Sequence, residues 1–334
     1  MTAPLARTLP AQTVARPDTP QGAADGAQAV PTRTAKVSVL ILTLNEEKNL
    51  ARCLESVSWS DDVVVLDSFS TDQTLEIARR HGARVYQRKF DNWSAHQNWA
   101  NENIDFKHKW VYYSDADEVV SPELAAELRD IADRTAGDAC SGAQGTARAG
   151  QGEGEGEGGT QHVAYRVRYK NYFLGKWIRF AGGYPIWVLR FFQPDKVRWE
   201  RLVNPAPVVD GSVGFLRHHF LHYSFNKGFD AWFDKHNKYS MGEALETIRS
   251  LDEDKFRFSS LLSSDPPARR RALKELSFRL PMRPVARFLY LYLLKFGFID
   301  GKAGFHYCVL VSIYEYMVVL KVQEQRRRAM QLPL

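Results

Sequence analysis

Alternating strand-like and helix-like segments between residues 36 and 133 constrain the fold of this chain most strongly. The predicted strands are short runs of aliphatic and aromatic residues, at Val37–Leu42, Asp62–Asp67, Gly82–Tyr86 and Trp110–Ser114. The predicted helices carry apolar residues at helical spacing, at Asn45–Val57 with Asn45 as N-cap, Gln73–His81, Trp93–Asn101 and Pro122–Asp133. Strands that alternate with helices in this way predict an α/β fold, a mostly parallel sheet flanked by helices on both faces.

Polar side chains follow three of these strands. Thr43, Asn45 and Glu46 follow the first, Asp67 ends the second, and an acidic cluster beginning at Asp115 follows the fourth. Ligands of open parallel sheets bind beyond the carboxyl ends of the strands. The sequence therefore predicts that these groups share one site.

The acidic cluster Asp115-Ala-Asp117-Glu118 places three carboxylates within four residues. Such a group is either a solvated turn or a site that a divalent cation neutralises. Mg²⁺ and Mn²⁺ prefer oxygen ligands, and Mg²⁺ is often shared between one or two carboxylates and substrate phosphates. Its position beside the other two polar clusters favours a metal site, in which Glu118 is expected to be structural.

The rest of the chain divides by composition. Residues 1–35 are polar and rich in Pro, Ala and Thr, which predicts a disordered leader rather than a secretory signal. Residues 136–161 include a Gly/Glu repeat that cannot bury a core, so they are predicted to be a low-complexity insertion in a domain spanning 36–224. Strand character returns at Tyr165–Arg168, Trp187–Phe192 and Phe215–Tyr223, with a turn at Val208–Gly211.

Residues 225–334 are predicted to form a helical, basic extension. From Asp265 onward the chain holds 13 Lys and Arg against 5 Asp and Glu. The apolar stretches Pro284–Asp300 and Ala303–Val322 are near or below the length of a membrane-spanning helix, and Glu315 interrupts the second. We expect two helices lying in the interface of an anionic membrane, and the alternative is a helical hairpin packed on the preceding domain.

Cysteine usage is consistent with a reducing compartment. Cys53, Cys140 and Cys308 are odd in number and far apart, so they predict neither a disulfide framework nor a metal cluster. We therefore expect a cytoplasmic protein, which the predicted interfacial helices would place peripherally on the inner face of a membrane.

The residues from Val39 to Leu50, the segment Val65–Thr74 and the Asp-x-Asp of the acidic cluster together resemble glycosyltransferase family 2, whose members have the GT-A fold. The similarity covers roughly Lys36 to Tyr223 without the insertion. It is nearest to bacterial enzymes that build lipopolysaccharide core or exopolysaccharide.

The resemblance implies an inverting, metal-dependent hexosyltransferase acting on a nucleotide diphosphate-sugar, with a UDP-sugar the expected donor. Thr43, Asn45 and Glu46 would line the nucleotide pocket, Asp67 would contact the uracil or ribose, and Asp115 would lie beside the ribose. The acceptor would be a glycolipid or a polysaccharide precursor, and nucleic acid is not an expected partner.

Further roles follow from the same resemblance. Asp117 would bind Mg²⁺ or Mn²⁺ bridging the diphosphate, and His222 is similar in place to a histidine that closes the metal or diphosphate site. Trp177, near a Gly-Gly turn, suits an acceptor-side wall, with core packing as the alternative.

The general base is where this chain departs from the family pattern. Many relatives carry a His-Glu pair before a Gly-rich turn, and here the corresponding residues are Asn204 and Pro205. Glu200 and Asp210 are the nearby carboxylates, and either is a candidate base; the alternative for each is a surface charge.

Two other functions compete with glycosyl transfer. A nucleotide-dependent oxidoreductase is disfavoured because no Gly-x-Gly-x-x-Gly follows the first strand. A catalytically degenerate protein that binds nucleotide-sugar or a membrane surface stays open, because the His-Glu pair is missing.

Overall fold

The structure is a computed structural model that describes residues 36–141, 162–200, 205–252 and 282–334, with side chains described except at 136–141. The predicted leader at 1–35 and most of the predicted insertion, residues 142–161, lie outside this part. Residues 136–141 are an exception to the predicted insertion, because they continue a helix.

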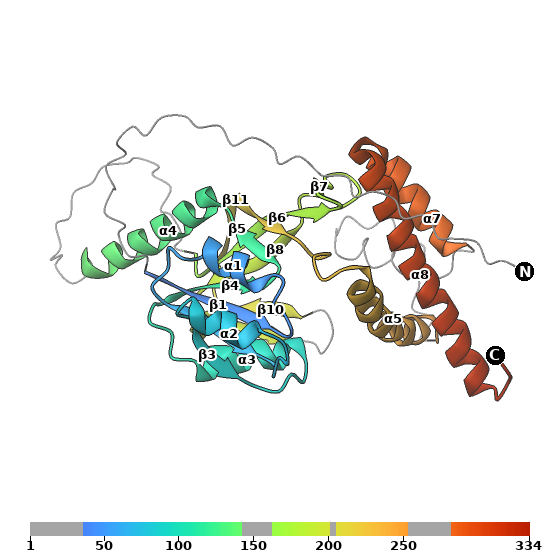
Figure 1. The fold of residues 1–334 in the computed structure, drawn as a ribbon, viewed down its shortest axis with the longest axis horizontal. Coiled ribbons are helices and arrows are strands. Elements are labelled where there is room, and N and C mark those ends of the chain that lie inside the picture. Colours follow the sequence, from blue (N-terminus) through green and yellow to red (C-terminus); the bar gives the residue numbers. More distant parts are fainter. Residues whose placement is uncertain (1–35, 142–161, 201–204, 253–281) are drawn as a thin grey trace, which may run out of the picture. The chain divides into compact units, whose positions relative to one another are not determined.

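A sheet of nine strands forms the centre of the described chain, and a two-stranded hairpin lies beside it (Figure 1). The strands are β1 (Val37–Thr43), β2 (Val63–Asp67), β3 (Arg84–Gln87), β4 (Trp110–Asp115), β5 (Glu118–Val120), β6 (Ala164–Phe173), β7 (Lys176–Trp177), β8 (Trp187–Phe192), β9 (Val197–Glu200), β10 (Ala206–Val209) and β11 (Val213–His222). The predicted turn at Val208–Gly211 is wrong in its first half, because Val208 and Val209 belong to β10, which pairs with β9.

The helices follow the predicted order. They are α1 (Leu50–Ser56), α2 (Thr74–Arg80), α3 (Trp93–Asn103), α4 (Pro122–Ser141), α5 (Phe229–Asp252), α7 (Arg283–Leu289) and α8 (Gly301–Ala329), with a π-helical turn at Tyr290–Leu294 and 3-10 turns at Pro194–Lys196 and Gly297–Asp300. The first helix begins later than predicted, since Asn49 is its N-cap and Asn45 has a left-handed φ of 54°.

The sheet confirms the predicted α/β class. Its order is β3-β2-β1-β4-β8-β6-β11-β5, and β7 pairs with β6. The first four strands are parallel, and so are β6 and β11. The two parallel sets meet through β8, which is antiparallel to both β4 and β6.

Each face of the sheet is covered by its own layer. One hydrophobic cluster combines β1, β4 and β11 with α1, α2 and α4, and includes Leu50, Trp110, Leu128 and Phe220. A second cluster lies on the other face, where α3 and the β9–β10 hairpin contribute Ala100 and Trp199. The strands are buried on both sides, which explains their continuous apolar sequences.

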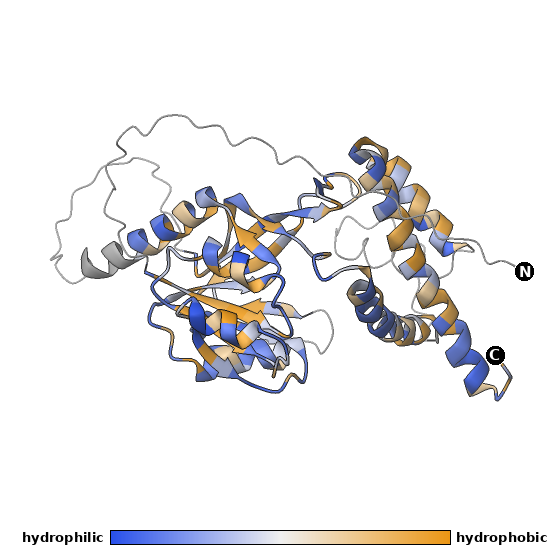
Figure 2. Cartoon of the chain, viewed as in Figure 1, coloured by the Kyte–Doolittle hydropathy of each residue, from blue (hydrophilic) through white to orange (hydrophobic). Residues whose placement is uncertain are grey.

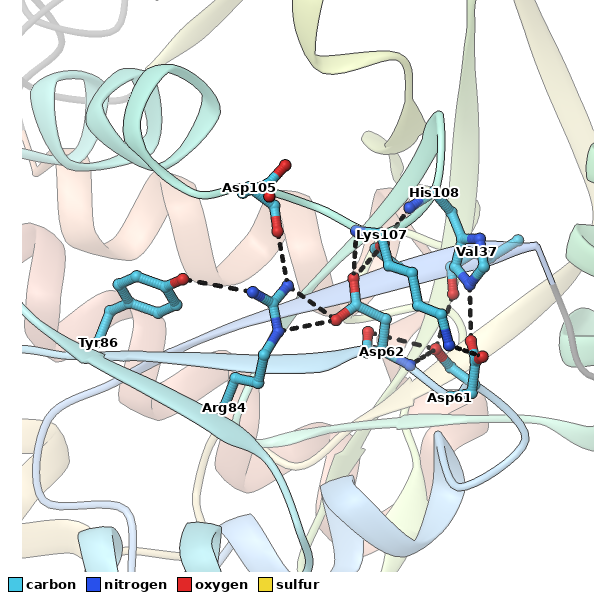
Figure 3. A network of polar contacts seen from close by, with 10 residues as sticks. Val37, Asp61, Asp62, Arg84, Tyr86, Asp105, Lys107 and His108 are labelled. Atoms are coloured by element: carbon cyan, nitrogen blue, oxygen red, sulfur yellow. Dashed lines mark hydrogen bonds and ion pairs between the residues drawn. The ribbon is translucent and has the colours of Figure 1, made fainter.

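A polar network closes the amino ends of the parallel strands, away from the predicted site (Figure 3). Asp62 accepts hydrogen bonds from the Ser38 hydroxyl at 2.5 Å, the Lys107 amide at 2.8 Å and Arg84 Nε at 3.0 Å. Burial raises the pKa of Asp62, but these hydrogen bonds outweigh it and lower the pKa below its usual value. The network ties β1, β2, β3 and the start of β4 together.

The C-terminal helices join the sheet domain through β6 and the loop after β7. Phe173 and Ile178 pack with Trp232 of α5 and with Ala303 and Leu310 of α8. The carboxylate of Asp300 accepts the backbone amides of residues 179, 180 and 181 at 3.1, 2.9 and 2.8 Å. The helical extension is therefore connected to the sheet domain by both apolar packing and a buried carboxylate.

One segment, Gly297–Ala329, is long and apolar enough to cross a membrane by length and composition. This differs from the sequence-based estimate, which put each C-terminal stretch near or below spanning length. The interrupting Glu315 is paired with Arg283 at 2.7 Å, and Arg287 lies 4.0 Å from its other oxygen. Figure 2 shows apolar and hydrophilic residues mixed along α7 and the first part of α8, and the last turns of α8 as hydrophilic.

Candidate functional site

The predicted polar clusters do converge at the carboxyl edge of the parallel strands. Thr43 of β1 donates to Asp67 of β2 at 2.9 Å, and β1 pairs with β4, which carries Asp115. A cavity of about 590 Å³ opens beside this edge, and its lining includes Trp93, Asp115 and Arg190. Such a cavity is large enough for a nucleotide or a sugar unit.

The loop after β1 is held against the loop after β2 by hydrogen bonds. The Asn45 side chain accepts the Thr71 amide at 2.8 Å, and the amide of Asn45 donates to Ser70 Oγ at 2.8 Å. Glu46 forms an ion pair of 2.5 Å with Lys227, which precedes α5. Burial raises the pKa of Glu46, and hydrogen bonds from Lys227 and Asn49 act against that increase.

Asp67 lies beneath this loop and is fully buried. Its carboxylate accepts the Ser70 amide at 2.8 Å and Gln87 Nε2 at 3.3 Å, in addition to Thr43. In this structure Asp67 organises the loop, and its contact with a nucleotide stays a prediction.

Arg190 of β8 was missed by the sequence interpretation. Its Nη2 contacts Asp115 at 2.6 Å and Glu118 at 2.5 Å, and its guanidinium lies 4.3 Å from the centre of the Tyr113 ring. A β-bulge directs it there, because the β6–β8 register jumps from Phe191 to Leu189. The signal was a single arginine inside the apolar strand Trp187–Phe192, since a buried charge needs a partner.

The acidic cluster divides into three roles. Asp115 accepts the Tyr113 hydroxyl at 2.6 Å as well as Arg190, so its orientation is fixed. Glu118 is almost fully buried and accepts the Asp115 amide at 3.2 Å, which is consistent with a structural role. Burial raises the pKa of Glu118 to about 8, since Asp115 shares the one guanidinium that opposes the increase.

Asp117 is left to pair with His222, whose Nε2 lies 3.5 Å from its carboxylate. The pairing follows from topology, because β5 places Glu118 opposite His222 of β11 and the Tyr223 amide donates to Asp117 O. Burial alone would raise the pKa of Asp117, but His222 lowers it to about 2. Burial would likewise lower the pKa of His222, and Asp117 raises it.

The carboxylate of Asp117 and the imidazole of His222 fit part of a divalent cation site. Both side chains keep about a fifth to a quarter of their surface exposed, 22% for Asp117 and 24% for His222. Within the described residues no three His, Cys, Asp or Glu side chains are grouped to hold a metal ion. Mg²⁺ can bind with only one or two ligands from the protein when phosphates and waters supply the remaining ligands.

Neither predicted base is part of the cavity lining. Glu200 ends β9 and forms an ion pair with Arg198 at 2.5 Å, with half of its side chain exposed. Asp210 is 82% exposed and pairs with Lys196 at 3.0 Å. The structure therefore does not bring these carboxylates together with Asp115, and their role as base stays a prediction.

Trp177, the predicted acceptor contact, lies on β7 outside the cavity lining. Its ring packs edge-on against Tyr184 with centroids 5.2 Å apart, and Lys170 Nζ lies 4.7 Å above it. The ring is half-buried beside a cation, so its contact with acceptor also stays a prediction.

Comparison with known proteins identifies the sheet domain. Residues 38–192 match the family model described as "Glycosyl transferase family 2". This segment belongs to glycosyltransferase family 2. The glycosyltransferase domain therefore has the GT-A fold expected from the sequence, and the oxidoreductase interpretation is set aside.

Curated relatives match part of the chain. An uncharacterized glycosyltransferase of Rickettsia typhi is 37% identical over 97 residues, which are 29% of this chain and 32% of that protein. The SPbeta prophage-derived glycosyltransferase SunS of Bacillus subtilis is 31% identical over 102 residues, 30% of this chain and 24% of that protein. The similarity to the Rickettsia protein thus spans about a third of that protein's length.

Among solved structures, residues 1–349 of TarS from Staphylococcus aureus cover 82% of this chain and 90% of the TarS fragment, at 13% identity and a TM-score of 0.37.

Proposed function

We propose that this protein is an inverting, metal-dependent glycosyltransferase that moves a hexose from a nucleotide diphosphate-sugar, with UDP-sugar the expected donor, to a lipid-linked saccharide. The observation that supports this most is the position of Asp115, which ends β4 and lines a cavity of about 590 Å³ in a family 2 domain, with Asp117 two residues further along the chain.

The nucleotide would lie along the loops after β1 and β2. Thr43, Asn45 and Glu46 would form one wall, and Asp67 would hold that wall in shape from below. Asp115, fixed by Arg190 and Tyr113, would accept hydrogen bonds from the ribose. This arrangement would orient the donor before reaction and so lower the entropic cost of reaching the transition state.

The diphosphate would lie near Asp117 and His222, where Mg²⁺ or Mn²⁺ would be held. When bound, the ion would stabilise the negative charge that develops on the leaving diphosphate. Lys235 is close enough to Asp117 to help lower the pKa of that carboxyl, and could add positive charge to the phosphates. Attack of an acceptor hydroxyl from the opposite face would invert the anomeric carbon, with the hydroxyl proton passing to a base for which Glu200 and Asp210 are candidates.

We place the enzyme at the cytoplasmic face of the inner membrane, where a lipopolysaccharide or exopolysaccharide precursor would be presented. The support is the tip defined by Leu289–Phe305, which joins α7 to α8. Among its members Leu293, Leu294 and Phe296 are 51%, 71% and 53% exposed. Exposed apolar side chains in such density, with Lys295 and Lys302 among them, are typical of a membrane-interface segment.

The test is a panel of nucleotide diphosphate-sugars assayed with Mg²⁺ or Mn²⁺. Donor hydrolysis and transfer should depend on metal, and Asp117→Asn should reduce turnover by at least about 100-fold, on the scale of losing a key electrostatic group. The matched control is Asp130→Asn, an exposed carboxylate on α4 paired only with Arg134 in the described part of the chain.

Metal-dependent turnover that survives in Asp117→Asn would refute the metal assignment. Binding to vesicles without binding to any nucleotide-sugar would instead favour the catalytically degenerate alternative.

A further inference from the structure

A row of cations lies on one face of β6. Tyr165, Val167 and Tyr169 face the hydrophobic cluster under α1 and α4. The residues that alternate with them, Arg166, Arg168 and Lys170, therefore lie on the other face. Strand geometry spaces successive members about 6.6 Å apart, so three like charges stand in a line.

Aromatic rings lie beside two members of this row, Arg168 and Lys170, and no described carboxylate forms an ion pair with either. Arg168 lies 5.5 Å from the centre of the Trp187 ring, and Lys170 lies 4.7 Å from that of Trp177. Arg179 approaches Trp177 from the next loop, at 5.8 Å.

In the described part of the chain no carboxylate forms an ion pair with Arg166, Arg168, Lys170 or Arg179. We call these four cations, with Trp177 and Trp187, the basic strip. Cations that repel one another beside apolar rings are stabilised by an anion brought from outside.

The strip leads into the catalytic cavity. Arg166 and Trp187 both line it, together with Asp115. Lys238 of α5 also lines the cavity, and it too has no ion pair in the described ranges. Among the described lining residues, Asp115 pairs with Arg190 and Asp91 with Arg88, and Glu243 of α5 is the third carboxylate.

We propose that the basic strip binds an anionic saccharide chain, bearing carboxylate or phosphate groups, whose end enters the cavity as the acceptor. The inference rests on the proposed function and specifies its acceptor class. The anionic groups of a chain laid along β6 would form ion pairs with Arg168 and Lys170. Its terminal sugar would then lie between Arg166 and Asp115. A nucleic acid would also meet the cations, but a cavity at one end of the strip fits a chain whose terminus reacts.

The experiment measures binding of defined probes to the full-length protein in the absence of any nucleotide-sugar. The probes are pentagalacturonic acid, which is carboxylated, maltopentaose, which is neutral, and a ten-residue oligothymidylate. The variant is Arg166→Gln/Arg168→Gln/Lys170→Gln. Its charge-matched control is Arg79→Gln/Arg80→Gln/Arg134→Gln, on the exposed surfaces of α2 and α4.

The unmodified protein should bind pentagalacturonic acid more tightly than maltopentaose, and added salt should weaken the binding. The strip variant should bind it about 10- to 100-fold more weakly, since three partly exposed ion pairs with the saccharide are lost. The control variant should bind like the unmodified protein. Circular dichroism checks that the variants are folded, and the single variant Lys170→Gln tests the strip with a smaller change.

Equal binding of the acidic and neutral probes, or undiminished binding in both strip variants, would overturn the proposal. Tighter binding of oligothymidylate than of the acidic saccharide would replace it with a nucleic-acid surface. Because no donor is present, failure of the proposed transfer reaction would leave this result unaffected and would be detected separately, in the donor panel.

Discussion

One guanidinium shared between two carboxylates sets the chemistry of the acidic cluster at the residue scale. Arg190 neutralises one charge of the pair Asp115 and Glu118, so an excess negative charge remains in a buried place. Burial raises the pKa of Glu118, and the neighbouring charge of Asp115 adds to this increase. Asp117 is thereby the member of the cluster free to face a ligand together with His222.

His96 provides a pH-dependent prediction at the same scale. It is 1% exposed on α3, and Arg88 Nη1 lies 2.9 Å from its Nδ1. Burial lowers the pKa of His96 to about 4, and the positive charge of Arg88 adds to this effect. Between pH 6.5 and 4 the unfolded chain takes up a proton that the folded chain does not, so the free energy of unfolding must fall as the pH falls.

The contribution is up to about 3 kcal/mol over this range. In His96→Gln this decrease in the free energy of unfolding between pH 6.5 and 4 should disappear. Urea unfolding at a series of pH values measures it. His81→Gln, at an exposed histidine ending α2, is the control and should behave like the unmodified protein. Parallel pH profiles for His96→Gln and the unmodified protein would refute this assignment.

The sequence identifies which residues carry charge, but not which of them meet. His222 was predicted to lie beside Asp117 only through a family resemblance. Arg190 was missed because a β-bulge, which depends on pairing between β6 and β8, decides where it points. Whether a carboxylate lies in a cavity or in solvent depends on the same long-range pairing, as Glu200 and Asp210 illustrate.

At the scale of elements, the strands and helices of the sheet domain were largely predictable, because buried parallel strands have uninterrupted apolar sequences. The errors fall at ends and connections. Asn45 takes a left-handed conformation instead of capping α1, and α4 extends to Ser141. The π-helical turn at Tyr290–Leu294 has no pattern that distinguishes it from α-helix.

Asp300 carries the prediction at this scale, because it fastens α8 to the loop after β7. Its carboxylate is buried and accepts three backbone amides, which lose their partner in Asp300→Ala. We expect the free energy that holds α8 to the loop after β7 to decrease by about 2–4 kcal/mol. Hydrogen exchange should accelerate at the amides of residues 179–181 while those of β1 and β4 stay protected.

Asp300→Asn is the matched control, since its remaining carbonyl oxygen still accepts and the effect should be smaller. Unchanged exchange at residues 179–181 in Asp300→Ala would show that apolar packing alone holds the helices.

At the scale of the whole molecule, the exposed tip Leu289–Phe305 predicts membrane binding. Leu294→Asp/Phe296→Asp should weaken binding to vesicles containing phosphatidylglycerol at least about tenfold, since each change removes an apolar contribution of roughly 1.5–3 kcal/mol. Vesicle flotation measures this, with Val208→Asp, an exposed valine on β10, as control.

Flotation that the tip variant leaves unchanged would contradict the interfacial assignment. Only 28% of the most apolar stretch of 18 residues within Gly297–Ala329 is buried. Resistance of the protein to extraction at alkaline pH would show instead that this segment spans the bilayer.

The pairing of β5 with β11 has a consequence for synthesis on the ribosome. Asp117 and His222 are more than 100 residues apart in the chain, yet β11 must dock beside β5 before they meet. A nascent chain that has released only β1 to β5 can bury much of its apolar surface and still lack the histidine. Under the proposed function, chains that end before β11 would therefore lack one predicted metal ligand and should not turn over donor.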